Sequence, residues 1–183
     1  MTIGHSTLPI EVFLAALKEN GCDLLVDVRR YPGSRRHPQF GQELLFLSLA
    51  EAGIRSTWRE GLGGRRKAQS QSVNTGWRNE AFRGYADYMQ TPEFNVEIDW
   101  LMQQIANRSV VVMCAEAVPW RCHRSLIADA VLARGAAVED IFVSPQGTSS
   151  RKPHHLTSFA RTEAGRVWYP AENSPQSDLF EAS

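Results

Sequence analysis

The chain has 183 residues, 43% of them hydrophobic and 22% charged, and its formal net charge is zero. This length suits one domain with a well-filled hydrophobic core and a tail. No apolar run is long enough to span a membrane, and the N-terminal MTIGHSTLP lacks the basic and apolar regions of a signal peptide. Three unevenly spaced cysteines do not suggest a disulfide framework, so we expect a cytoplasmic protein.

Short runs of apolar and β-branched residues predict the strands of a sheet. In chain order these strands are Thr2–His5, Leu24–Val28, Ile54–Trp58, Val110–Met113 and Val138–Val143. Near the end of the chain, Val167–Tyr169 is typical of a further strand or of a segment that docks on the domain.

Apolar residues at helical spacing predict the helices, which alternate with the strands. In chain order they are Pro9–Asn20, Gln42–Ala52, Glu80–Met89, Pro92–Ala106 and Leu126–Ala133. Thr91 is suited to cap one of them, and Gly135 to end the last. This alternation predicts a three-layer α/β domain with a mainly parallel sheet, Rossmann-like or rhodanese-like.

We divide the chain into an α/β domain (residues 1–145), an extension that packs on it (146–170) and a flexible tail (171–183). Within the domain, Arg30–Gln42 is too rich in Pro, Gly and Arg for regular structure. Gly61–Gly76 contains several glycines and a polar Gln/Ser run, and we expect a mobile loop over the site there.

The zero net charge hides a basic segment. Between Arg29 and Tyr85 there are eleven basic and four acidic residues, and the chain has 17 Arg against 3 Lys. Arginine is suited to bidentate phosphate recognition, although a charge run is more often a solvated face.

Reactive side chains gather after the strand at 110–113. Because a parallel strand ends and a helix begins there, this junction is where open α/β folds bind ligands, and helix amides favour an anion. The candidate catalytic residues are Cys114, Glu116, Cys122 and His123.

Several chemistries are open for this junction. Cysteine phosphatases and rhodaneses use a Cys-x5-Arg loop, but here Trp120 is the sixth residue after Cys114 and the first arginine is Arg121. Cys114, Cys122 and His123 lack the spacing of structural zinc, so no metal is predicted. A Cys114–Cys122 redox pair is a further alternative, and Cys22 is most simply a packing residue.

Polar residues after the first two strands add a candidate binding surface for an anion or a substrate. Arginines and hydroxyls can hold phosphates while an aromatic ring stacks on a base. The candidate binding residues are His5, Ser6, Asp27, Arg29, Arg30, Ser34 and Arg35, together with Arg124 from the junction after the strand at 110–113.

Five motifs occur in one order along the chain. They are Thr2–Ser6, Asp27–Arg29 with Pro32 and Ser34-Arg35, Leu62–Gly64, Phe82–Met89, and Cys114–Glu116 with Cys122–Arg124. In these motifs the chain resembles domain-of-unknown-function family 488, from about residue 2 to about residue 143. The resemblance implies a compact α/β domain and points to these residues, but it implies no particular reaction or cofactor.

The tail carries a second signal. Gln176-Ser177-Asp178-Leu179-Phe180 resembles the pentapeptide Gln-x-(Ser/Asp)-Leu-Phe by which bacterial replication and repair proteins dock on the DNA sliding clamp. Leu179 and Phe180 would fill an apolar pocket while Gln176 makes polar contacts, and Asp178 is the fourth candidate partner-binding residue.

Three functional hypotheses follow. The first is a DNA-maintenance protein that binds DNA or a phosphate-bearing nucleotide in the Arg-rich pocket and is tethered to the sliding clamp. The second is a non-catalytic adaptor with the same tether. The third is a cytoplasmic cysteine enzyme of sulfur or phosphate chemistry, with the tail incidental.

Overall fold

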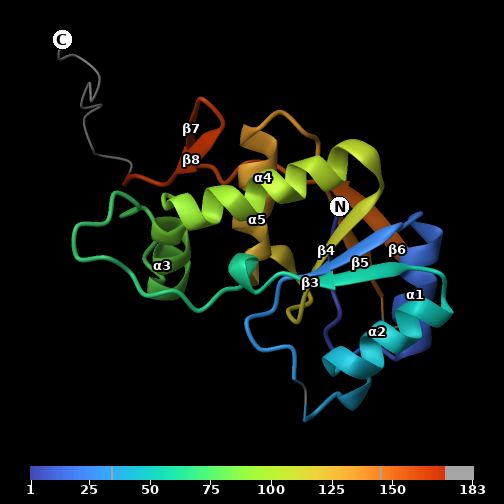
Figure 1. Cartoon of the computed structure of the whole chain (residues 1–183). Coiled ribbons are helices and arrows are strands. Elements are labelled where there is room, and N and C mark those ends of the chain that lie inside the picture. Colours follow the sequence, from blue (N-terminus) through green and yellow to red (C-terminus); the bar gives the residue numbers. More distant parts are fainter. Residues whose placement is uncertain (34, 145, 172–183) are drawn as a thin grey trace.

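The protein forms a six-stranded sheet. The computed structural model describes residues 1–33, 35–144 and 146–171. The strand order is β3-β2-β4-β1-β5-β6, and all neighbours are parallel except β5 and β6 (Figure 1). The strands are β1 (Thr2–Gly4), β2 (Leu24–Asp27), β3 (Arg55–Trp58), β4 (Val110–Cys114), β5 (Glu139–Val143) and β6 (Ser149–Pro153).

Helices cover both faces of the sheet. They are α1 (Ile10–Glu19), α2 (Gln42–Glu51), α3 (Glu80–Tyr88), α4 (Pro92–Asn107) and α5 (Arg124–Ala133), with short 3-10 turns η1 (Pro38–Phe40), η2 (Glu60–Leu62) and η3 (Pro119–Arg121). One apolar cluster joins α1 and α2 to the sheet, and a second joins α3, α4 and α5 to the opposite face (Figure 1). The prediction of a three-layer α/β domain with a mainly parallel sheet is confirmed.

Alternation along the buried strands explains the two clusters. In β4, Val111 and Met113 pack with α1 and α2, whereas Val110, Val112 and Cys114 pack with the other helices. Successive side chains of a strand point to opposite faces, so a continuous apolar run fills both layers. Cys114 therefore points to the face covered by α5.

Two of the differences from the sequence-based prediction have a clear physical reason. Strand β6 was not predicted because Ser149–Pro153 is polar and mostly exposed, as an edge strand can be. Helix α5 begins at Arg124, two residues before the predicted Leu126, because Arg124 is buried and apolar periodicity does not detect a buried cation. Among the described residues, no helix is both long and apolar enough to cross a membrane.

The segment after β6 packs against the domain. It contains the hairpin of β7 (Arg161–Glu163) and β8 (Arg166–Trp168), and Tyr169 after it is fully buried. The Tyr169 N–H donates to Asn74 Oδ1 at 2.9 Å, and its ring lies beside Trp77. The C-terminal segment thus contributes to the core between α3 and α5.

A buried polar network also holds this segment. His154 Nδ1 lies 2.8 Å from Asp140 and its Nε2 3.2 Å from Asp129. Tyr169 Oη and Thr157 Oγ1 donate to the same Asp129 carboxylate, each at 2.8 Å. Because both ring nitrogens of His154 face carboxylates, both must donate, and the imidazole is protonated.

The charge of His154 stabilises the fold. Burial lowers the pKa of His154, but the hydrogen bonds with Asp129 and Asp140 outweigh it and raise the pKa to about 9. A group whose pKa is raised on folding stabilises the protein below its unfolded pKa of about 6.5 and ceases to do so as the pH rises through 9.

We therefore expect His154→Gln to lower the free energy of unfolding most at pH 6, and the deficit to shrink by about 2 kcal/mol at pH 10. Urea unfolding at both pH values measures this change. His155→Gln, a substitution of the exposed neighbouring histidine, is the matched control. A deficit that is independent of pH would contradict the assigned charge.

Candidate functional site

The candidate site lies at the carboxyl ends of the central strands β2, β4 and β1. The chain leaves β1 for α1 on one face of the sheet and leaves β4 for α5 on the other face. The backbone loops after β1 and β4 stay adjacent, since the His5 N–H donates to Cys114 O and the Ser6 N–H to Ala115 O. Neighbouring strands whose connections diverge in this way form the crevice where α/β folds bind ligands.

A buried ion pair lies on one side of this edge. Arg29 Nε donates to Asp27 Oδ1 at 2.9 Å, and Arg29 Nη2 lies 2.6 Å from Asp27 Oδ2. Arg29 Nη1 donates to Phe40 O and lies 3.4 Å from His5 Nε2. Asp27 therefore neutralises Arg29 and orients it towards His5.

His5 is held as a neutral ring. Its Nδ1 lies 2.9 Å from Ser6 O, and because a carbonyl only accepts, Nδ1 carries the proton. Its ring stacks on Phe40 with centroids 4.1 Å apart. Burial, followed by the charge of Arg29, lowers the pKa of His5 to about 4.

The two cysteines of the junction meet. Cys114 ends β4, Cys122 precedes α5, and the structure pairs their sulfur atoms across a Cα–Cα distance of 7.5 Å. The Arg124 N–H at the start of α5 points to Cys122 Sγ at 3.5 Å. Both side chains are buried, which places the pair beneath the loop at 115–121.

Arg124 is the centre of this arrangement. Its side chain is 1% exposed, and Nη1 lies 2.8 Å from Cys114 Sγ. Nη1 and Nη2 also donate to the carbonyls of Glu116 and Ala117, and Nε to Thr2 Oγ1. Burial lowers the pKa of Arg124 to about 10, so the guanidinium stays charged at neutral pH.

His123 adjoins the second cysteine. Its Nε2 lies 3.1 Å from Val28 O and therefore carries the proton, which leaves Nδ1 as an acceptor 3.6 Å from Cys122 Sγ. Burial lowers the pKa of His123 to about 4. A neutral imidazole is thus fixed beside the Cys122 sulfur.

Close packing of glycines holds the surrounding loops. A Cβ on Gly4 would overlap with the carbonyl oxygen of Glu116, and one on Gly64 would lie 2.8 Å from His123 Nδ1. The segment 61–76, predicted as a mobile loop over the site, is anchored at several points, while residues 65, 67, 69–71, 73 and 75 in it are exposed. Tyr85 Oη donates to Leu62 O, and the Gln69 N–H donates to Asp87.

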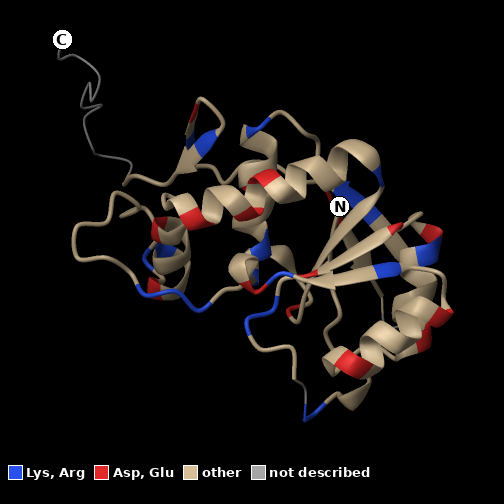
Figure 2. Ribbon diagram, viewed as in Figure 1, with Lys and Arg blue, Asp and Glu red and all other residues tan. Residues whose placement is uncertain are grey.

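The predicted binding residues do not form one arginine-rich pocket. Arg29 is paired with Asp27, Arg124 is surrounded by its own loop, and Arg30 pairs with Glu60 at 3.0 Å. Figure 2 shows basic residues on several loops near the carboxyl ends of the strands. Arg35 is an exposed cation in the segment between β2 and α2, whereas Ser34 lies outside the described residues.

Glu116 also differs from its predicted role. Its side chain is exposed, and the atom that contacts the site is its backbone carbonyl oxygen. Sequence analysis could not distinguish these two oxygens. It placed Thr2 and Gly64 in two of the five motifs but gave neither of them, nor Phe40, a role in the site, because an isolated hydroxyl, ring or glycine does not point to a particular chemistry.

Comparison with known proteins decides the family. Residues 9–131 match the family described as domain of unknown function DUF488. The chain belongs to the DUF488 family. No curated protein and no solved structure shows a significant match.

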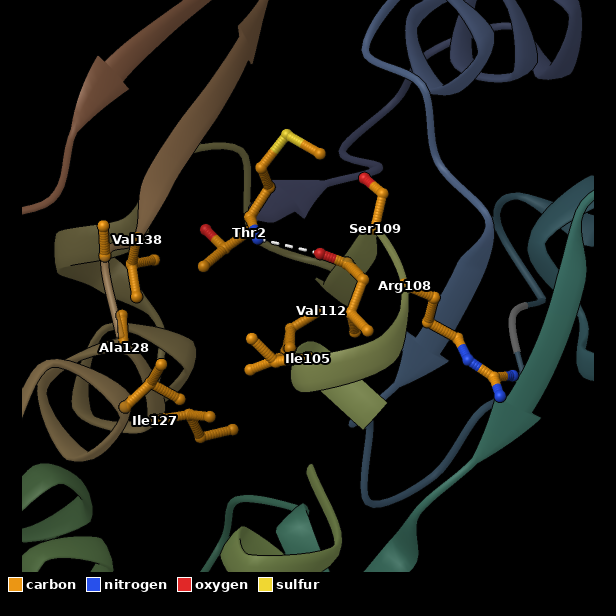
Figure 3. Close-up of a pocket in the computed structure, with 12 residues that line it drawn as sticks. Thr2, Ile105, Arg108, Ser109, Val112, Ile127, Ala128 and Val138 are labelled. Carbon is orange, nitrogen blue, oxygen red and sulfur yellow. Dashed lines mark hydrogen bonds between the residues drawn. The ribbon is translucent and has the colours of Figure 1, made fainter. Parts of the chain in front are cut away.

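A separate cavity of about 170 Å³ lies at the amino ends of the strands in this DUF488 protein. Figure 3 shows Ile105, Val112, Ile127 and Val138 around it, while the Arg108 guanidinium extends away from it. Its lining is mainly aliphatic and contains none of the candidate catalytic residues. Within the described part of the chain, no group of three or more His, Cys, Asp or Glu side chains is placed to hold a metal ion.

Gly4→Ala tests the contact between β1 and the cysteine loop. We expect it to lower the free energy of unfolding by about 1–3 kcal/mol, because the added methyl group displaces the Glu116 carbonyl that accepts from Arg124. Urea unfolding measures the loss. Gly33→Ala is the matched control, since a Cβ there meets no atom within 4 Å. Equal stability of the two variants would contradict the close packing.

Proposed function

We propose that this DUF488 protein is a cysteine-dependent oxidoreductase in which Cys114 and Cys122 interconvert between dithiol and disulfide. The observation that carries this proposal is the contact of Arg124 Nη1 with Cys114 Sγ at 2.8 Å. Among the described residues, Arg124 forms no ion pair with a carboxylate. A buried cation is costly without an anion, so the site favours a thiolate at Cys114.

The surroundings of Cys122 also favour its role as the second thiol of the dithiol–disulfide pair. The amide at the start of α5 points to its sulfur, and helix N-termini favour a thiolate. His123 Nδ1 is placed to relay the thiol proton to a leaving group, since its pKa of about 4 keeps the resting ring neutral. Each sulfur therefore has a donor that favours its thiolate, Arg124 for Cys114 and the α5 amide for Cys122.

Thiol–disulfide exchange with a disulfide substrate would proceed in two steps. The Cys122 sulfur attacks one substrate sulfur and the sulfur–sulfur bond of the substrate breaks, forming a mixed disulfide. The Cys122 proton passes through His123 Nδ1 to the leaving sulfur, which departs as the first substrate thiol and leaves the ring neutral. The Cys114 thiolate then attacks Cys122 Sγ, which closes the Cys114–Cys122 disulfide and releases the second substrate sulfur as a thiolate that takes a proton from solvent. The substrate gains two electrons, and a low-molecular-weight thiol of the glutathione class returns the protein to the dithiol.

Phosphatase chemistry is less well supported by this geometry. An oxyanion needs free donors, but the Arg124 donors already contact Cys114, two loop carbonyls and Thr2. The loop therefore turns carbonyl oxygens inwards, towards the guanidinium. A phosphate-binding loop instead turns its backbone amides inwards, towards the anion.

Equilibration with mixtures of reduced and oxidised glutathione tests the proposal. We expect mass spectrometry after alkylation to show Cys114 and Cys122 oxidised together, while Cys22 stays a thiol because burial raises its pKa to about 12. Arg124→Met should shift this equilibrium about tenfold towards the disulfide, because the reduced form loses the stabilised thiolate.

Arg121→Met is the matched control, since Arg121 is exposed in the same loop. Cys114→Ser should abolish the intramolecular disulfide in any mixture. If wild-type protein forms no Cys114–Cys122 disulfide at any ratio of the two glutathione forms, the oxidoreductase proposal fails.

The tail motif favours a second function, a role in DNA maintenance. Gln176, Asp178, Leu179 and Phe180 lie outside the described residues, so this proposal rests on their sequence. In it the tail tethers the protein to the bacterial sliding clamp, and DNA or a nucleotide contacts exposed cations such as Arg35 and Arg121.

Deletion of residues 176–180 should abolish capture of the protein by an immobilised sliding clamp, because the Leu-Phe pair supplies the apolar anchor. Deletion of residues 171–175 is the control of equal length. Capture that survives the first deletion would refute the tether, and DNA affinity that does not fall with added salt would remove DNA as a ligand.

A further inference from the structure

A continuous path of buried polar groups leads away from the cysteine pair. Arg124 Nε donates to Thr2 Oγ1 at 3.3 Å, and Thr2 Oγ1 donates to Asp140 Oδ1 at 2.5 Å. The other oxygen of Asp140 contacts His154, whose second nitrogen contacts Asp129. The path joins Cys114, at the end of β4, to the segment after β6.

We propose that Asp140 and His154 are positioning residues that set how strongly Arg124 stabilises the Cys114 thiolate. This inference rests on the proposed thiol chemistry and extends it to the regulation of that site. In the dithiol form Arg124 has two anions within its reach, one in direct contact (the Cys114 thiolate) and one through Thr2 (Asp140). The two compete for a single buried positive charge.

Arg124 is the cation for which Cys114 and Asp140 compete, because the other ionisable groups near Cys114 are neutral, neutralised by a partner or exposed to solvent. Arg29 is neutralised by Asp27, and burial lowers the pKa of both His5 and His123 to about 4, so both rings are neutral at pH 7. The carboxylate of Glu116 is on an exposed side chain, where solvent screens it.

The charges along the path balance. Asp129 and Asp140 are two carboxylates, while Arg124 and His154 are two cations, so a thiolate at Cys114 adds one negative charge to a neutral buried group. Hydrogen bonds with His154 and Thr2 outweigh burial and lower the pKa of Asp140, which keeps its carboxylate ionised. Removing one charge from the path must therefore change the ionisation of the thiol.

The two positioning residues predict shifts of opposite sign. Asp140→Asn removes the competing anion, so the pKa of the Cys114 thiol should fall by about 0.5–1 unit. His154→Gln removes a cation and leaves two carboxylates, so the pKa of the same thiol should rise by a similar amount. A merely structural role would produce no opposed pair of shifts.

The experiment uses the full chain carrying Cys22→Ser and Cys122→Ser, so that Cys114 is its single thiol. The ultraviolet absorbance of the thiolate is followed against pH in this background and in each variant. Glu139→Gln is the matched control. It removes a carboxylate from β5, the strand that also carries Asp140, but the Glu139 side chain is 41% exposed.

A fall with Asp140→Asn and a rise with His154→Gln support the inference, and if one of these variants does not fold, the sign of the other decides. Equal shifts, or shifts no larger than that of Glu139→Gln, overturn it. Failure of the proposed function is a distinct result, namely an ordinary cysteine pKa in the background protein together with no Cys114–Cys122 disulfide in the wild type.

Discussion

Burial of the Arg124 guanidinium is the constraint on which the rest of the site depends. A charged group taken out of water must have every donor satisfied, and those of Arg124 reach Thr2 in β1, Cys114 at the end of β4 and two carbonyls of the following loop. The strand end, the loop and the helix start are therefore fixed relative to one another by a single side chain. Gly4 completes the arrangement, because only glycine leaves room for the carbonyl that Arg124 binds.

This constraint also explains why the junction resembles a phosphate-binding loop without being built as one. Strand, loop and helix follow one another as in rhodaneses and cysteine phosphatases, and a cysteine ends the strand. The arginine, however, lies in the first turn of the helix and points back beneath the loop to Cys114. The same architecture hosts different chemistries according to which groups fill the junction.

Much of the fold was predictable because apolar periodicity records burial. The strands at 24–28 and 110–113 and the helix capped by Thr91 follow directly from it. The basic segment was a weaker guide, because sequence does not show that Asp27 neutralises Arg29 or that Glu60 pairs with Arg30. Clustering of arginines in sequence predicted one anion pocket, whereas the structure distributes them among separate partners.

The polar path to His154 could not be predicted at all, because it joins residues 2, 124, 140 and 154, none of which belongs to a local motif with the others. These positions also differ in whether the family match covers them. The DUF488 match covers residues 9–131, so Arg124 lies inside it, whereas Thr2, Asp140, His154 and Tyr169 lie outside.

The family region therefore supplies the cysteines and the guanidinium, and the flanking segments supply the charges that compete for that guanidinium. A domain with the same Cys114, Cys122 and Arg124 but without Asp140 and His154 would hold its thiol in a different electrostatic environment. It follows that the chemistry of this site belongs to the complete α/β unit, including the segment that packs on it after β6.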